Sequence, residues 1–194
     1  MTQLVNQKND KHGVSMDCPK CKTVPLRATK LEQGLSAMGC ANCNGAVISL
    51  LYYRDWLERS SPIAEGDVAN TQAVEEVEDS HAALMCPKCK KLMTKYKVSG
   101  CSNSRLDLCA SCDEVWLDGG EWELLKSLEL SRKMPVVFTQ EWQRKLKKKA
   151  LEDTREQRLL KVIDENEIEE VKRIREWLKK HPNRNEIMFF LNHE

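Results

Sequence analysis

The C-terminal part of the chain repeats apolar residues at the spacing of an α-helix. Phe138, Trp142, Leu146 and Ala150 recur at every fourth position, which places them on one helical face. A second stripe of this kind consists of Ile168, Val171, Ile174, Trp177 and Leu178. Residues 134–194 are therefore predicted to form a helical region, whose stripes either pack against the rest of the protein or bind a partner helix.

Polar residues mark the ends of these helices. Asp164 followed by Glu167 is typical of a capping box at a helix start. The His-Pro pair at 181–182 predicts the end of that helix, because proline cannot continue it. Asn183 with Glu186 repeats the capping pattern ahead of a short final helix.

The pattern upstream is shorter and favours strands. Residues 92–98 and 104–108 are predicted to be two strands that flank a turn at 99–103. A pair of cysteines stands at each end of this predicted hairpin, and the N-terminal part of the chain repeats the arrangement about 68 residues earlier. Both copies open with the same tetrapeptide, Cys-Pro-Lys-Cys, at 18–21 and 86–89.

Eight of the nine cysteines fall into C-x-x-C pairs, and their spacing is that of two zinc sites with four cysteine ligands each. The predicted ligands are Cys18, Cys21, Cys40 and Cys43 in the first site and Cys86, Cys89, Cys109 and Cys112 in the second. The alternative, a disulfide framework, needs an oxidising compartment, and no secretory signal is recognisable at the N-terminus. Two structural Zn2+ ions per chain are therefore expected. The ninth cysteine, Cys101, lies in the predicted turn.

The predicted fold class is a small zinc-stapled α+β protein with two zinc ribbons and an α-helical C-terminal region. Each ribbon is a short β-hairpin with two knuckles, the tight turns at its C-x-x-C pairs, which together supply four cysteines. So small a core depends on metal binding for much of its folding free energy. The expected organisation is a disordered tail at 1–15, ribbon one at 16–60, an acidic linker at 61–80, ribbon two with a following helix at 81–131, and the helical region at 134–194.

Composition and charge narrow the functional classes. Apolar residues make up 41% and charged residues 31% of the chain, and no apolar run is long enough to span a bilayer. We expect a cytoplasmic protein that does not enter a membrane. The formal net charge is +1, and eight thiolates with two Zn2+ ions lower it by four, to −3. Net charge therefore does not indicate a general nucleic-acid binder.

One dense basic run stands apart from this balance. It comprises Arg144, Lys145, Lys147, Lys148 and Lys149. The run could contact phosphates, although acidic residues close by in the sequence favour a solvated helix face with ion pairs.

The stretch CASCDEVWLDGGE at 109–121, together with CPKC at 86–89, resembles the transcription-factor-IIB-type zinc-finger family of small prokaryotic zinc ribbons. The resemblance covers residues 85–128, with a degenerate copy at 17–58. It implies a zinc ribbon followed by a helix and, through distant homology, a link to transcription. The chain departs from the family pattern at Glu114, where glycine is usual. The first copy keeps that glycine, as Gly45, but has VISLL at 47–51 in place of the Trp-Leu-Asp-x-Gly-Glu run.

The run after the second knuckle is expected to be structural. Trp116 extends the last strand and covers the knuckle, Asp118 caps the following helix, and Glu121 suits the first turn of that helix. The alternative is an exposed acidic docking point formed by Asp118 and Glu121.

These patterns favour a non-enzymatic zinc-binding adaptor or regulatory protein that recognises a macromolecule. The expected partner is a protein, or a second copy of the chain, bound through the C-terminal helices. The alternatives are a transcription-linked nucleic-acid-binding zinc ribbon and a redox-controlled zinc chaperone. No small-molecule substrate is expected, because a zinc ion with four cysteine ligands has no open position for one.

Overall fold

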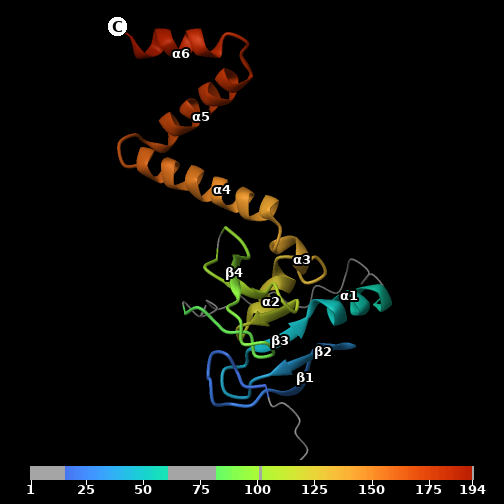
Figure 1. The fold of residues 1–194 in the computed structure, drawn as a ribbon. Helices are drawn as coiled ribbons and strands as arrows, with labels where there is room; N and C mark the ends of the chain where they lie inside the picture. The colour runs from blue at the N-terminus through green and yellow to red at the C-terminus, as the bar shows by residue number, and fades with distance from the viewer. Residues whose placement is uncertain (1–15, 61–81, 101, 194) are drawn as a thin grey trace, which may run out of the picture. The chain divides into compact units, whose positions relative to one another are not determined.

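The computed structural model describes residues 16–60, 82–100 and 102–193, and these divide between two compact units, 1–144 and 145–194. The expected disordered tail, the whole of the expected acidic linker and Cys101 lie outside the described residues. The described part is α+β, with an antiparallel sheet and six helices (Figure 1).

The first unit contains one six-stranded sheet to which both ribbons contribute three strands. The spatial order is β1-β2-β3-β6-β5-β4. The strands are β1 (Arg27–Glu32), β2 (Leu35–Gly39), β3 (Ala46–Ser49), β4 (Thr94–Lys97), β5 (Arg105–Cys109) and β6 (Glu114–Leu117). The predicted strands at 92–98 and 104–108 correspond to β4 and β5. The sequence prediction missed that each ribbon adds a third strand after its second knuckle.

The two ribbons join through antiparallel pairing of β3 with β6. Val47 stands opposite Trp116, and Ile48 stands opposite Val115. The second knuckles and the strands that follow them are offset by 69 positions between the copies, so Val47 and Trp116 are equivalent residues that face each other. The pairing therefore has the symmetry of an isologous dimer interface, with a pseudo-twofold axis between these two residues.

Alternation along β3 and β6 gives the sheet two buried faces. Ile48, Val115 and Leu117 belong to a core on the side of the helices, whereas Val47 and Trp116 pack with the cysteine clusters. The first core is completed by side chains of α1 (Leu50–Arg59), α2 (Glu121–Ser127) and α3 (Met134–Val137). Burial of apolar area on both faces thus holds the two ribbons in one unit.

Tyr53 of α1 ties this core together through its hydroxyl. The phenol donates to the Ser131 carbonyl oxygen at 2.8 Å and accepts from the Met134 backbone N–H at 3.1 Å. The side chain is fully buried, and burial raises the pKa of Tyr53 from 10.0 to about 12 although the Met134 N–H opposes the shift. The neutral phenol is therefore the form that the fold requires.

We expect Tyr53→Phe to lower the free energy of unfolding by about 1–2 kcal/mol, because the buried Met134 N–H and the partly buried Ser131 carbonyl lose their partner. Because the folded pKa is raised, the contribution of the phenol is fully present below pH 10 and is lost as pH rises through about 12. Urea unfolding of the zinc-loaded protein between about pH 7 and pH 11.5 measures both effects. Tyr52→Phe is the matched control, since Tyr52 is 63% exposed; an equal loss in both variants would contradict this account.

The helices after α3 are α4 (Gln140–Leu159), α5 (Glu165–Lys180) and α6 (Arg184–Asn192). The first turn of α4 belongs to the first unit, where the Trp142 Nε1–H donates to the Val98 carbonyl at 3.1 Å. The capping box between Asp164 and Glu167 is confirmed. Asn183 precedes α6 as predicted, but its side chain makes no capping hydrogen bond. None of the described helices is both long enough and apolar enough to cross a membrane.

The second unit has almost no core of its own. Among the described residues of 145–194, Ile168 is the single buried side chain. Two ion pairs link α4 to α5, Glu156 with Lys172 at 2.7 Å and Glu152 with Arg175 at 3.6 Å. In the rest of the apolar stripe on α5, Val171, Ile174 and Trp177 are exposed and Leu178 is half-buried.

Candidate metal centres

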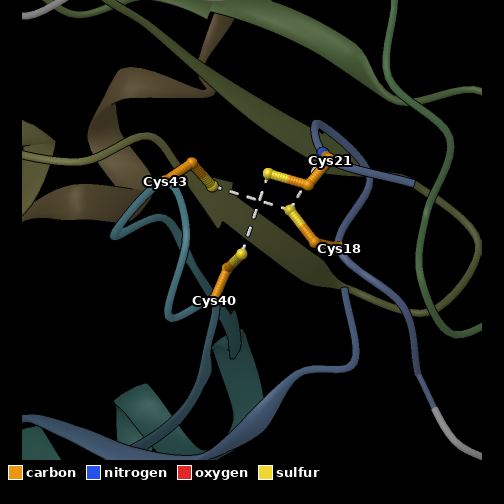
Figure 2. Close-up of side chains that lie close together, drawn as sticks. All are labelled: Cys18, Cys21, Cys40 and Cys43. Carbon is orange, nitrogen blue, oxygen red and sulfur yellow. Dashed lines mark hydrogen bonds between the residues drawn. The ribbon is translucent and has the colours of Figure 1, made fainter. Parts of the chain in front are cut away.

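The predicted cysteines converge into two clusters of four. In each cluster the ligand atoms lie within 4.8 Å of one another. Figure 2 shows the sulfur atoms of the first cluster pointing toward a common centre. The members of the first cluster are Cys18, Cys21, Cys40 and Cys43, and those of the second are Cys86, Cys89, Cys109 and Cys112.

The distances between sulfur atoms fit a tetrahedral metal ion. Four sulfurs at the usual Zn–S distance of about 2.3 Å would stand about 3.8 Å apart. In the first cluster, Cys18 and Cys43 are 3.6 Å apart and Cys21 and Cys40 are 3.9 Å apart. Four of the sulfur–sulfur distances in the second cluster lie between 3.4 Å and 3.7 Å. A disulfide would need about 2.05 Å, so each cluster could hold one metal ion.

All four knuckles share one backbone conformation. The residue after the second cysteine has a positive φ in every case: Lys22 at 65°, Asn44 at 55°, Lys90 at 60° and Asp113 at 53°. Each of these residues donates its N–H to the carbonyl oxygen of the first cysteine of its pair, at 2.7–3.0 Å. This hydrogen bond closes the turn and directs both sulfurs to the same side. Asparagine and aspartate tolerate the left-handed region, whereas the lysines adopt it at some cost.

The pKa values of the cysteine thiols are shifted in opposite directions. Burial raises the pKa of Cys18, Cys43 and Cys86. Burial opposes ionisation of Cys40 as well, but the N–H groups of Cys43 and Asn42 outweigh it and lower the pKa of Cys40 to about 7. The Lys91 N–H likewise lowers the pKa of Cys89 to about 7.

Each cluster therefore holds one readily ionised thiol close to others that burial keeps protonated. Four thiolates so close together repel one another, and a divalent cation removes this conflict while displacing protons. The donor set thus favours a soft, closed tetrahedral metal site.

The Trp116 side chain packs against the knuckle of the other ribbon. A Cβ atom placed on Gly45 would stand 2.3 Å from Trp116 Cζ2, so only glycine leaves room for the indole there. A Cβ on Gly119 would likewise stand 2.8 Å from the Cys43 carbonyl oxygen. Trp116 therefore covers a knuckle as predicted, but the knuckle it covers belongs to the first cluster.

Asp118 and Glu121 are buried parts of the same contact. The Trp116 Nε1–H donates to Asp118 Oδ1 at 3.1 Å, and the Asp118 backbone N–H donates to Glu121 Oε2 at 2.8 Å. Lys20, from the first knuckle, lies 3.4 Å from Asp118 Oδ1. The N-cap of α2 is Gly120, so the predicted capping role of Asp118 is wrong. The two carboxylates are 3% and 1% exposed, which leaves no accessible acidic docking point in this conformation.

Glu114 makes the contact in the second ribbon that corresponds to the contact between Lys20 and Asp118. Lys88, the equivalent of Lys20, forms an ion pair with Glu114 at 2.7 Å, and this contact raises the pKa of Lys88. Glu114 stands opposite Ser49, which occupies the position equivalent to Asp118. Each knuckle lysine thus meets one carboxylate, supplied by β6 in one case and by the residue after β6 in the other. Sequence reasoning missed the Lys20–Asp118 and Lys88–Glu114 contacts, because these residues come together only once β3 is paired with β6.

Ser49 also explains why the first copy lacks a counterpart of the Trp-Leu-Asp-x-Gly-Glu run. Its side-chain hydroxyl caps α1 by accepting from the Leu51 N–H at 3.3 Å, so the helix starts directly after β3. In the second copy, residues 118–120 separate β6 from α2, and Gly119 lies close to the Cys43 carbonyl oxygen of the first ribbon.

The basic run lies on α4 and is not part of either cluster. All five residues of the run are exposed and lie along the N-terminal half of that helix: Arg144, Lys145, Lys147, Lys148 and Lys149. Arg144 donates to Gln140 Oε1, one turn earlier in the same helix, at 3.4 Å.

We compared the chain with known families, curated proteins and solved structures. No family model matches the chain, and no curated protein and no solved structure matches it.

Proposed function

We propose that this chain is a non-enzymatic adaptor or regulatory protein, stapled by two structural Zn2+ ions, that recognises another protein. The two clusters of four cysteines support the zinc assignment, because four thiolates satisfy the ion completely. An ion held in this way offers no position for water or substrate, which argues against metal-assisted catalysis at either cluster.

The observation that carries the proposal is the exposed apolar surface of α5 and α6. Val171, Ile174 and Trp177 of α5 are 42%, 45% and 53% exposed, and Phe189 and Phe190 of α6 are 67% and 79% exposed. Helices of these lengths are marginal in water without packing of their apolar faces. Contiguous apolar side chains on a surface typically mark an interaction site. A protein partner, or a second copy of the chain, would supply the missing core.

The proposal is tested by affinity capture with the zinc-loaded full chain and quantitative identification of what is retained. We expect Trp177→Glu to lower recovery of the specific partner roughly tenfold or more, as for a buried aromatic anchor. Asn166→Glu is the control, because it adds the same charge to the same helix at an exposed polar position. Equal recovery by both variants would contradict the proposal, and size measurement by light scattering shows whether the partner is a second copy.

A nucleic-acid-binding function is the second candidate, and the basic run on α4 favours it. It requires binding to mixed DNA or RNA that weakens steeply with salt and is lost when Lys147, Lys148 and Lys149 are changed to glutamine. Salt-sensitive binding that these changes abolish would put this function ahead of the protein adaptor.

A further inference from the structure

The two edges of the six-stranded sheet are equivalent positions that are closed to different degrees. β1 and β4 are the outermost strands, one from each ribbon. Lys97 of β4 stands opposite Arg105, and Lys30 of β1 stands opposite Ser36, which precedes Arg105 by 69 positions. Lys30 and Lys97 are therefore equivalent residues on opposite edges of the sheet.

The edge formed by β4 is closed by a side-chain amide. Gln143, in the first turn of α4, accepts from the Lys97 N–H at 3.3 Å and donates to the Lys97 carbonyl oxygen at 2.9 Å. The amide thus makes the two hydrogen bonds that a residue of a neighbouring strand would make. Because both bonds go to Gln143, the N–H and the C=O of Lys97 point away from β5.

The edge formed by β1 has no such cover. Leu26, just before this strand, donates its N–H to the Met16 carbonyl oxygen at 2.8 Å. Hydrogen-bonding groups of successive strand residues point to alternate sides, so Ala28 and Lys30 direct theirs to the same side as Leu26. The equivalence with Lys97 identifies this side as the outer edge. In the described chain no residue bonds to Ala28 or Lys30 there, and β2 is the only strand that pairs with β1.

The side chains of this edge carry unbalanced positive charge. Residues 27–30 are exposed. Neither Arg27 nor Lys30 forms an ion pair with any residue that the structure describes. The carboxylate of the same strand, Glu32, lies 3.9 Å from Lys126 instead. The edge therefore combines unpaired backbone groups with two cations.

A cavity adjoins the same edge. Its volume is about 450 Å³, and Ala28, Lys30, Met38 and Val47 are among its lining residues. Residues directly opposite each other on neighbouring strands place their side chains on the same face of the sheet. A strand added to β1 would therefore place the side chain opposite Ala28 at this cavity, where Met38 and Val47 favour an apolar group.

We propose that an extended, acidic segment of a partner protein binds to β1 as a seventh, antiparallel strand. It presents carboxylates to Arg27 and Lys30 and an apolar side chain to the cavity beside Ala28. Strand addition to an exposed edge derives its affinity from main-chain hydrogen bonds and its specificity from alternate side chains. Opposite charges across neighbouring strands add to the stability of the pairing. This inference rests on the proposed function and identifies a second contact for the same class of partner.

The test uses a short synthetic peptide, blocked at both ends, whose sequence ends in Glu-Thr-Val-Glu. Paired antiparallel with β1, these four residues stand opposite Lys30, Thr29, Ala28 and Arg27 in that order. The peptide is titrated into the zinc-loaded full chain and followed by proton–nitrogen correlation NMR. We expect saturable shifts along β1 and slower hydrogen exchange at the amides of Ala28 and Lys30, but not at those of Arg27 and Thr29, which point to β2. Absence of saturable shifts along β1 would overturn the proposal.

Methylation of the peptide nitrogens separates strand addition from attraction between charges alone. Methyl groups on the first glutamate and the valine remove the donors aimed at the carbonyl oxygens of Lys30 and Ala28. Binding should then weaken about tenfold or more. Methyl groups on the threonine and the last glutamate lie on the outer side and should change binding little. Equal weakening by both patterns would contradict strand addition.

Substitutions in the protein test the same register. Ala28→Pro removes an outward N–H and should abolish binding, although an edge position whose N–H faces solvent tolerates proline. Arg27→Glu combined with Lys30→Glu should reject the acidic peptide and bind one that ends in Lys-Thr-Val-Lys. Lys147→Glu with Lys148→Glu is the matched control, because it changes the net charge equally at exposed positions of α4. Zinc content reports folding in each variant, and binding of the acidic peptide by the folded charge-reversed chain or the folded Ala28→Pro chain would overturn the proposal.

Two further outcomes identify other occupants of the edge. Slower exchange of the Ala28 and Lys30 amides on raising the protein concentration without peptide would place a second copy there and overturn the partner-protein proposal. Peptide binding that appears only after removal of residues 1–15 would place the N-terminal segment of the same chain there, with the same consequence. Failure at this edge leaves the partner capture through α5 unaffected, so the two proposals fail separately.

Discussion

Replacing Cys109 with serine is expected to release both metal ions. Cys109 is a member of the second cluster and also the last residue of β5, where it pairs with Glu114 of β6. Loss of the second ion should therefore disorder β6, which is the strand that joins the second ribbon to β3. The first cluster would then lose the indole of Trp116 from its knuckle.

The magnitudes favour complete unfolding of this unit. A structural zinc ion contributes an apparent binding free energy of about 10–16 kcal/mol at neutral pH. The net stability of an ordinary domain is only about 5–15 kcal/mol. We therefore expect zinc content to fall from two ions per chain to well below one, with loss of the near-ultraviolet circular dichroism of the buried tryptophans. Metal analysis of protein purified in zinc-containing buffer measures the first quantity directly.

Cys101→Ser is the control, because Cys101 belongs to no C-x-x-C pair. It should keep both ions. A Cys109→Ser chain that retains one tightly bound zinc and a folded first ribbon would show that the ribbons fold independently, which is the opposite of a shared sheet.

Trp116→Ala is expected to cost about 3–5 kcal/mol, which is typical of removing a buried tryptophan. It should also disturb the surroundings of one cluster more than those of the other. The indole packs on Gly45, two residues after Cys43, so its loss exposes the knuckle of the first cluster. The chemical shift of cadmium bound in place of zinc should therefore change more at the first cluster than at the second.

Cadmium NMR distinguishes a disturbance at one cluster from a general loss of stability, because each cluster gives its own signal after zinc is replaced by cadmium. Trp56→Ala is the matched variant, since Trp56 is 5% exposed and packs on the helical side of the sheet. It should destabilise the unit to a similar extent without a larger chemical-shift change at one cluster. Equal shift changes at both signals in Trp116→Ala would rule out a selective contact with the first cluster.

The sequence predicts which cysteines form each cluster, but it does not predict how the two ribbons pair. Cysteine spacing specifies a tetrahedral ligand set almost by itself, because knuckle geometry is local. The capping box at Asp164 and Glu167 is equally local, and the structure contains it. The β3–β6 pairing joins residues 69 positions apart through strands of four residues, which are too short and too uniformly apolar for their register to be read from periodicity.

Other differences follow from that pairing. Asp118 does not cap α2, because in the paired sheet it accepts a hydrogen bond from Trp116 and lies near Lys20 instead. Glu114 stands where the first copy has Gly45 in the sequence, and in the structure it is the carboxylate that meets Lys88. The stripe of α5 has correct helical spacing, but periodicity alone cannot tell whether the covering surface belongs to the same chain.

The central claim is that two metal ions staple one shared sheet. Native mass spectrometry of the wild-type chain, recorded during stepwise addition of a zinc chelator, tests it most directly. The account predicts two zinc ions per chain at the start and direct conversion of the two-zinc form to the metal-free form, because loss of either ion disorders the β3–β6 pairing. A long-lived one-zinc species, or a starting content other than two, would contradict it.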